Sequence, residues 1–204
     1  MKIKKLLIII FILLFFLSSY FVYSFLTSPR YSIYKIQSSI QHKDKEIFLQ
    51  YVDIDSIIDD FLQQMILEES RGVNPDNPLE HFKSQLKIKL IEKFRPSIKQ
   101  YFKQSILSYF NSTAENLILP QEAQILLLKK LESFSIPSHI GMQYSIDRII
   151  YPEQNIAIVE FHIIPENAPP IILKLKFIKQ NFYWKLIAIP NLYEFLLKLN
   201  ELKF

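Results

Sequence analysis

Residues 6–26 read LLIIIFILLFFLSSYFVYSFL and contain no charged side chain. As an α-helix this stretch of about 21 residues would be about 31 Å long, because each residue adds about 1.5 Å. The hydrocarbon core of a bilayer is about 30 Å thick. The stretch therefore predicts a membrane-spanning helix, and the rest of the chain is organised around it.

The charges beside this stretch predict its orientation. Lys2, Lys4 and Lys5 precede it, and only Arg30 follows closely. Positive residues favour the cytoplasmic side, so we expect residues 1–27 to form a cytoplasmic tip and anchor in the inner membrane of a bacterium. Residues 28–204 would then form one domain outside the cytoplasm. The alternative is a cleaved signal peptide with a small-residue site at residues 22–24, but the apolar part of a signal peptide usually has only about 7–15 residues.

The composition excludes several classes of function. The chain has no cysteine, so it has no disulfide, no thiolate metal site, no cysteine nucleophile and no lipid-bearing cysteine. Part of its net charge of +4 belongs to the N-terminal lysines, which leaves no electrostatic case for binding nucleic acid. Gly72 and Gly141 are the only glycines, so glycine-rich phosphate-binding loops are excluded.

Helical signals dominate the first half of the remaining chain. Pro29 suits the first position of a helix, and Asp44 and Asp53 are placed as N-caps before apolar residues at helical spacing. Pro78 can begin a further helix, which Pro96 is expected to kink or end. A leucine-rich helix is predicted over residues 121–134.

The hydrophobic period changes to two after Pro137. Alternating residues predict strands over residues 140–146, 157–163, 171–177 and 182–186, followed by a short helix over residues 193–202. The connections, residues 152–155 among them, are short, so consecutive strands should pair as antiparallel hairpins. We therefore expect an α+β fold in which an N-terminal transmembrane helix is followed by several helices packed on a four-stranded antiparallel meander sheet.

Two resemblances follow from these patterns. Helices followed by a sheet whose last strand reads Trp184-Lys185-Leu186 resemble the cystatin-like and nuclear-transport-factor-2-like cone folds. Locally, Ser28-Pro29-x-Tyr31, Ile40 within SSIQHKDKEIF and Tyr51-Val52-Asp53 resemble an uncharacterised bacterial family of membrane-anchored proteins, a domain-of-unknown-function family. That resemblance implies no activity.

The cone fold raises the question of a pocket. Its candidate lining is aromatic and consists of Tyr144, Phe161, Phe177 and Trp184. An open pocket with a buried carboxylate or histidine would favour a small enzyme such as an isomerase or dehydratase. Candidate carboxylates are Asp53, Asp55, Asp59 and Asp60, but capping, the helix dipole and solvent explain them more simply. His42, His81, His139 and His162 lack the spacing of a metal site.

Lysines follow the helix that Pro78 begins. Lys83, Lys87, Lys89 and Lys93 flank an apolar stripe on both sides, a pattern typical of helices that lie on a lipid surface. Acidic helices packed on basic ones would explain the same charges. We therefore expect a non-enzymatic membrane protein, with no cofactor or metal, that binds an envelope protein or an apolar ligand.

Overall fold

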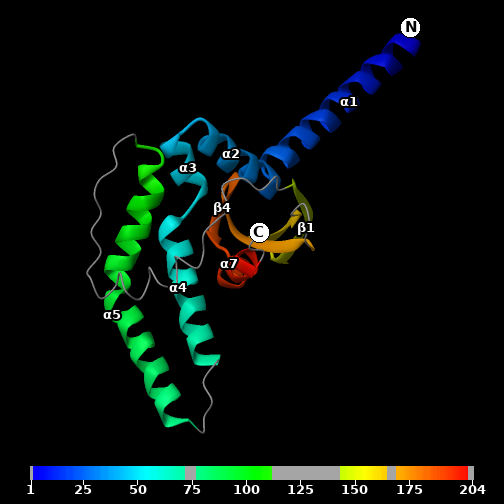
Figure 1. Ribbon diagram of the computed structural model, residues 1–204. Helices are drawn as coiled ribbons and strands as arrows, with labels where there is room; N and C mark the ends of the chain where they lie inside the picture. Colours follow the sequence, from blue (N-terminus) through cyan, green and yellow to red (C-terminus); the bar gives the residue numbers. More distant parts are fainter. Residues whose placement is uncertain (1, 72–76, 112–142, 165–168, 202–204) are drawn as a thin grey trace.

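The structure is a computed structural model that describes residues 2–71, 77–111, 143–164 and 169–201, with the backbone alone in residues 2–9 and 143–144. The described helices are α1 (Lys2–Leu26), α2 (Pro29–Gln41), α3 (Lys45–Tyr51), α4 (Ile54–Arg71), α5 (Pro78–Ser108) and α7 (Leu192–Glu201). The strands are β1 (Gln143–Glu153), β2 (Ile156–Ile164), β3 (Ile171–Gln180) and β4 (Tyr183–Ala188). The predicted α+β class is confirmed, and Figure 1 shows α1 projecting from a body made of the other elements.

The predicted helix starts are confirmed by their hydrogen bonds. Ser28 caps α2 by accepting from the Tyr31 N–H, and Pro29 takes the first helical position. The Asp44 carboxylate accepts from the Ile47 N–H at 3.0 Å at the start of α3. Such caps satisfy backbone donors that have no partner within the first turn, which fixes where each helix begins.

Pro96, which was predicted to kink or end this helix, does not end it, because α5 continues through Pro96 to Ser108. Pro96 and Glu92, the residue whose carbonyl loses its helical partner, are both exposed, so water can take the place of the missing donor. The residues of α5 that are buried are Ser84, Ile91 and Ile98, at a spacing of seven. Helices α4 and α5 pack side by side as a long hairpin.

The sheet has the predicted antiparallel order β1-β2-β3-β4. Strand β1 continues beyond its predicted end at residue 146 to Glu153, so it includes residues 152 and 153, which were expected in a loop. Pro152 is tolerated there because β1 is an edge strand and its pairing shifts register between Ile150 and Glu153. The predicted helix over residues 121–134 and the predicted strand start at 140–142 lie outside the described residues.

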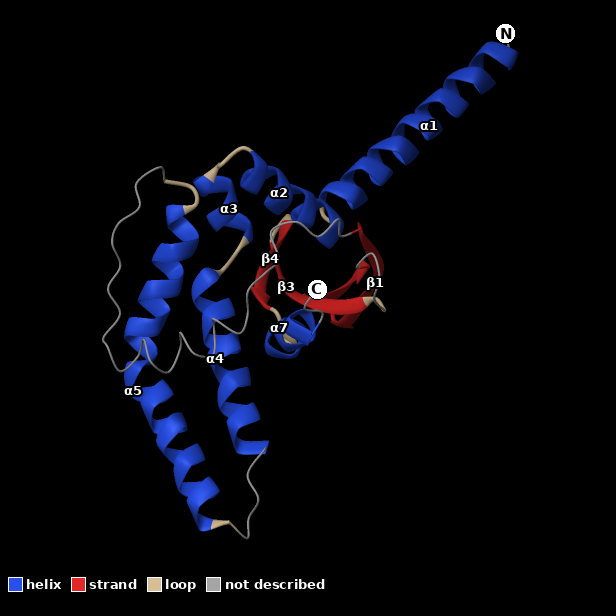
Figure 2. Cartoon of the chain, viewed as in Figure 1, coloured by secondary structure: helices blue, strands red, loops and turns tan. Residues whose placement is uncertain are grey.

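The core lies between one face of the sheet and the helices. Ala157, Val159 and Phe177 are fully buried on that face, where they meet Leu62 and Met65 of α4. The chain between α3 and α4 covers the edge of β4, since the Asp53 N–H donates to the Leu186 carbonyl at 2.8 Å. Helix α7 packs on β3 and α4, and Figure 2 shows it beside the curled sheet.

Candidate functional site

The base of α1 is the place where an exposed apolar helix meets the body. Every side chain of residues 10–26 is exposed, and α1 contacts mainly α2. Within the described part of the chain, no single helix has both the length and the apolar character needed to cross a membrane. Residues 10–26 and α2 have the required length and apolar character only when taken together, as a pair of helices bent by 58°.

Side-chain hydroxyls end α1 and begin α2. Thr27 Oγ1 donates to the Tyr23 carbonyl at 2.9 Å, and Ser28 Oγ donates to the Phe25 carbonyl at 2.7 Å. The Tyr23 carbonyl also accepts from the Thr27 N–H and the Phe25 carbonyl from the Ser28 N–H, each at 3.0 Å, so both carbonyls at the end of α1 accept two hydrogen bonds. Because Ser28 also caps α2, the bend between the helices is fixed by local chemistry.

Trp184 links the bend between α1 and α2 to the sheet through two hydrogen bonds. Its indole Nε1–H donates to the Thr27 carbonyl at 2.8 Å, and its backbone N–H donates to Ser32 Oγ of α2 at 3.0 Å. Trp184 is only 3% exposed and Ser32 is fully buried. Buried donors of this kind are costly to leave unpaired, so the two bonds hold the end of α1 in a defined place on β4.

Aromatic rings and cations surround Trp184. The Tyr151 ring of β1 lies 5.8 Å from the Trp184 ring, so the sheet curls until its two edge strands meet. Lys179 Nζ lies 5.8 Å from the same ring, and Lys35 Nζ lies 5.5 Å from the Tyr31 ring. Burial raises the pKa of Tyr151, and the nearby Arg30 charge opposes that rise.

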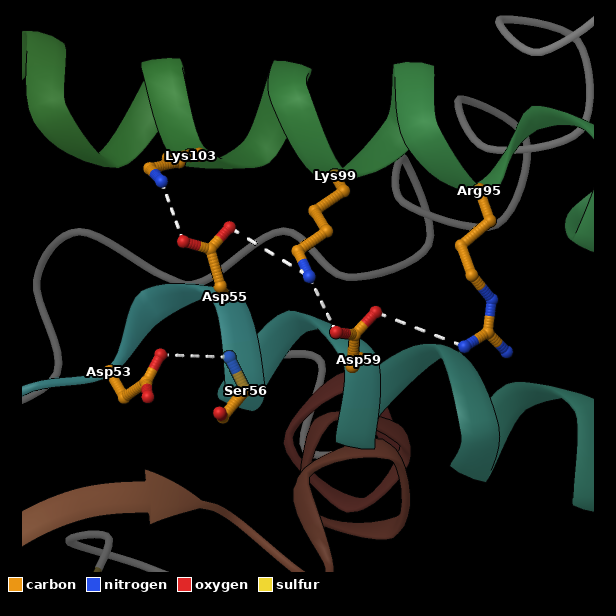
Figure 3. Close-up of polar contacts among 7 residues, drawn as sticks. All are labelled: Asp53, Asp55, Ser56, Asp59, Arg95, Lys99 and Lys103. Carbon is orange, nitrogen blue, oxygen red and sulfur yellow. Dashed lines mark hydrogen bonds and ion pairs between the residues drawn. The ribbon is translucent and has the colours of Figure 1, made fainter.

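The predicted carboxylates Asp55 and Asp59 lie at the α4–α5 contact (Figure 3). Lys99 Nζ lies 2.5 Å from Asp59 and 3.8 Å from Asp55, which also accepts from Lys103 at 2.6 Å. Arg95 lies 3.8 Å from Asp59. The hydrogen bond from Lys103 is the main cause of the lowered pKa of Asp55. A carboxylate held ionised by cations is a poor proton acceptor, so this arrangement serves to join the helices.

The other two predicted aspartates also have structural partners. Asp53 caps α4, because its carboxylate accepts from the Ser56 N–H at 3.1 Å. Asp60 accepts from the Gln64 amide at 2.7 Å, and the same amide donates to the Ile189 carbonyl at 2.8 Å. Asp59 and Asp60 are therefore half-buried rather than free in water, because α5 and α7 pack beside them.

The aromatic residues predicted to line a pocket divide into two groups. Phe177 and Trp184 are buried in the core, and Phe161 packs against it half-buried. Tyr144 pairs with Ile163 across β1 and β2, and only its backbone is described. The three described side chains thus pack with the helices.

The predicted lipid-facing lysines lie on the N-terminal half of α5. Lys83, Lys89 and Lys93 are exposed, and Lys87 pairs with Glu69 of α4 at 2.9 Å. Between them Leu79, Phe82 and Leu86 form an exposed apolar stripe. Figure 1 shows this end of α5 at the opposite end of the molecule from α1.

No cluster of metal-ligating side chains occurs within the described ranges. His42 Nδ1 lies 2.8 Å from the Ser38 carbonyl, and His162 lies 3.7 Å from Asp147. His81 is exposed on α5. His139 lies outside the described residues.

Sequence reasoning missed one buried charge, Glu160 of β2, which is 3% exposed. Arg148 of β1 donates to it at 2.5 Å, and Lys174 of β3 lies 3.7 Å away. Each partner stands directly opposite Glu160 in the sheet. The hydrogen bond from Arg148 is the main cause of the lowered pKa of Glu160. The signal that could have found it is a charged residue in the middle of an apolar strand, with Arg148 and Lys174 in the two neighbouring strands.

Replacing Glu160 with Gln is expected to lower the free energy of unfolding near neutral pH by about 1 kcal/mol, a modest value because both partners are largely exposed. A lowered pKa in the folded state stabilises the protein above the ordinary glutamate pKa, and this contribution is lost as the pH falls through the folded-state pKa. Urea unfolding at several pH values should show wild type and variant converging in acid. A pH-independent difference would contradict this account, and Glu153→Gln, an exposed change on β1, is the control.

Comparison with known proteins gave one match to a family model, in the N-terminal half of the chain. A family model described as "Protein of unknown function (DUF2939)" matches residues 15–109, which are 95 of the 204 residues. The match contains the residues that carry the predicted resemblance to a domain-of-unknown-function family and spans the second half of α1 together with α2 to α5. Neither the curated proteins nor the solved structures gave a significant match.

Proposed function

We propose that the chain is a single-pass membrane protein that α1 anchors in the inner membrane of a bacterium, with residues 1–27 as cytoplasmic tip and anchor. The observation that carries the proposal is the unbroken exposure of apolar side chains over residues 10–26. Soluble proteins rarely leave an apolar surface of this extent in water. The helix continues back to Lys2, so the apolar residues 6–9 extend the candidate span.

Two of the three serines of α1 support an apolar environment. Ser18 and Ser19 both donate to the Phe15 carbonyl, at 2.9 Å and 2.8 Å. A helix in hydrocarbon must satisfy its polar groups internally, and these serines do so. Tyr20 and Tyr23 lie near the end of α1 that meets the body, where interfacial aromatic residues are typical.

For residues 28–204 we propose a domain outside the cytoplasm that binds an envelope protein or an apolar ligand and carries no catalytic activity. The curled sheet with helices on one face would be a variant of the cone fold. The exposed stripe of Leu79, Phe82 and Leu86 supports a binding role, and the cations paired with Asp55 and Asp59 argue against a catalytic carboxylate there.

Washing membranes with alkaline carbonate tests the anchor. The full chain should stay in the membrane pellet, and its intact mass should match the uncleaved 24.3 kDa. Release into the supernatant would contradict the anchor. A mass equal to that of the chain without its first 24 residues would show that the N-terminal segment is a cleaved signal peptide and not an anchor.

A further inference from the structure

The end of the body that meets α1 carries aromatic and cationic side chains, which we call the junction rim. Its members are Arg30, Tyr34, Lys35, Tyr151, Lys179 and Phe182, all exposed except Lys35, which is half-buried. Phe182 is 71% exposed, Tyr34 is 59% exposed and Tyr151 is 54% exposed. They belong to α2, β1, β3 and the β3–β4 turn, so three separate parts of the sequence bring exposed aromatic rings to one end of the body.

The hydrogen bonds of Trp184 place this rim at the base of α1. Phe182 lies in the two-residue turn that precedes β4, two residues before Trp184. Trp184 in turn donates to Thr27, the residue that follows α1. The β1–β2 turn lies at the same end of the sheet, because alternate turns of an antiparallel meander share an end. Tyr151, just before that turn, contacts the Trp184 ring.

We propose that the junction rim is a second membrane contact, which seats on the anionic headgroup layer of the leaflet from which α1 emerges. This inference rests on the proposed function, since α1 must lie in the bilayer. Aromatic residues are enriched at the interface between hydrocarbon and headgroups, and Lys and Arg side chains near the surface are attracted to anionic lipids. The rim holds three cations, and Glu153, the last residue of β1, is an exposed carboxylate beside the β1–β2 turn.

The rigid junction lowers the free-energy cost of the contact between the rim and the lipid surface. Once α1 is inserted, the rim is held at the bilayer surface. Its association with lipid headgroups therefore does not cost the translational and rotational entropy that an untethered molecule would lose. The bonds from Trp184 to Thr27 and Ser32 fix the body relative to α1, so the same face meets the surface each time. The α5 stripe lies at the far end of the α4–α5 hairpin and would meet the same bilayer only if that orientation changed.

Because the chain has no cysteine, single cysteines can report on lipid contact one position at a time. Leu14→Cys, Phe182→Cys and Phe82→Cys would each be labelled with an environment-sensitive fluorophore in the full-length protein. The proteins would be reconstituted in phosphatidylcholine vesicles with and without phosphatidylglycerol, in which some lipids carry a nitroxide quencher below the headgroup. Gln154→Cys, in the β1–β2 turn, provides a second rim probe if Phe182→Cys fails to fold.

We expect strong quenching at position 14 in both vesicles, quenching at position 182 that increases with phosphatidylglycerol, and none at position 82. Replacing Arg30, Lys35 and Lys179 by Gln should lower the equilibrium constant for docking of the rim on anionic vesicles by about fivefold for each charge removed. Quenching at 14 without quenching at 182 or 154 would overturn the rim and leave the anchor intact. Quenching at position 82 and not at position 182 would overturn the rim and show that α5 and its lysines contact the lipid instead. No quenching at 14 would overturn the anchor itself.

Discussion

Replacing Leu14 and Leu17 together by Arg is expected to move the protein out of the membrane fraction. Both leucines lie in the exposed middle of α1. An arginine at the centre of a spanning helix costs about 2.5–3.5 kcal/mol, so two would remove about 5–7 kcal/mol of insertion free energy. Fractionation of cell lysates, followed by a carbonate wash, measures the effect.

The matched control places the same charges on exposed leucines of the body. Leu67→Arg with Leu86→Arg changes one residue on α4 and one on α5, both about half exposed. This variant should stay in the membrane pellet. Equal loss of both variants from the pellet would show that association depends on general apolar surface rather than on α1.

Replacing Trp184 by Ala is expected to lower the free energy of unfolding by about 3–5 kcal/mol. The change removes a large buried side chain and the indole donor to Thr27. Trp184→Phe should cost less, because it keeps most of the packing and loses the hydrogen bond. Ser32→Ala should cost about 1–3 kcal/mol, because it leaves the buried Trp184 N–H without its partner.

These variants should be compared by urea unfolding of the detergent-solubilised full chain, followed by circular dichroism because Trp184 is the sole tryptophan. Phe182→Ala is the control, since Phe182 is an exposed aromatic residue two positions away and its loss should change stability by about 0.5 kcal/mol or less. A Trp184→Ala effect no larger than that of Phe182→Ala would contradict the role of Trp184 at the junction.

The parts of the fold that depend on local signals could be predicted from the sequence. Asp44 and Asp53 cap their helices and α2 begins at Pro29, as expected, because these signals act between near neighbours in the chain. Strict alternation of apolar residues gave the four-stranded antiparallel meander, since consecutive strands with short connections pair with each other.

The parts that depend on tertiary neighbours could not be predicted. The α5 stripe of Leu79, Phe82 and Leu86 has helical periodicity, yet the face that packs on α4 is the one with Ile91 and Ile98. A stripe shows which residues share a face, and the partner decides which face is buried. The ion pairs of Glu160 and the contact of Trp184 with Thr27 join residues whose meeting depends on sheet register and curl.

The candidate site shows the same division. The apolar run and its flanking lysines lead to the proposal of an anchor without any tertiary information, whereas the junction rim depends on three segments that only the fold brings together. Trp184 was predicted as part of the aromatic lining of a pocket, but its role in holding the end of α1 could not be read from the Trp-Lys-Leu pattern. That role depends on an acceptor in Thr27, about 157 residues away in the sequence.

Labelling single cysteines in intact spheroplasts with a membrane-impermeant maleimide tests the central claim most directly. Ile3→Cys lies in the proposed cytoplasmic tip, and Glu80→Cys lies on the exposed start of α5. Membrane anchoring through α1 predicts that position 80 is labelled before lysis and that position 3 is labelled only after permeabilisation. Labelling of position 3 but not position 80 in intact spheroplasts, or of neither position until lysis, would contradict it.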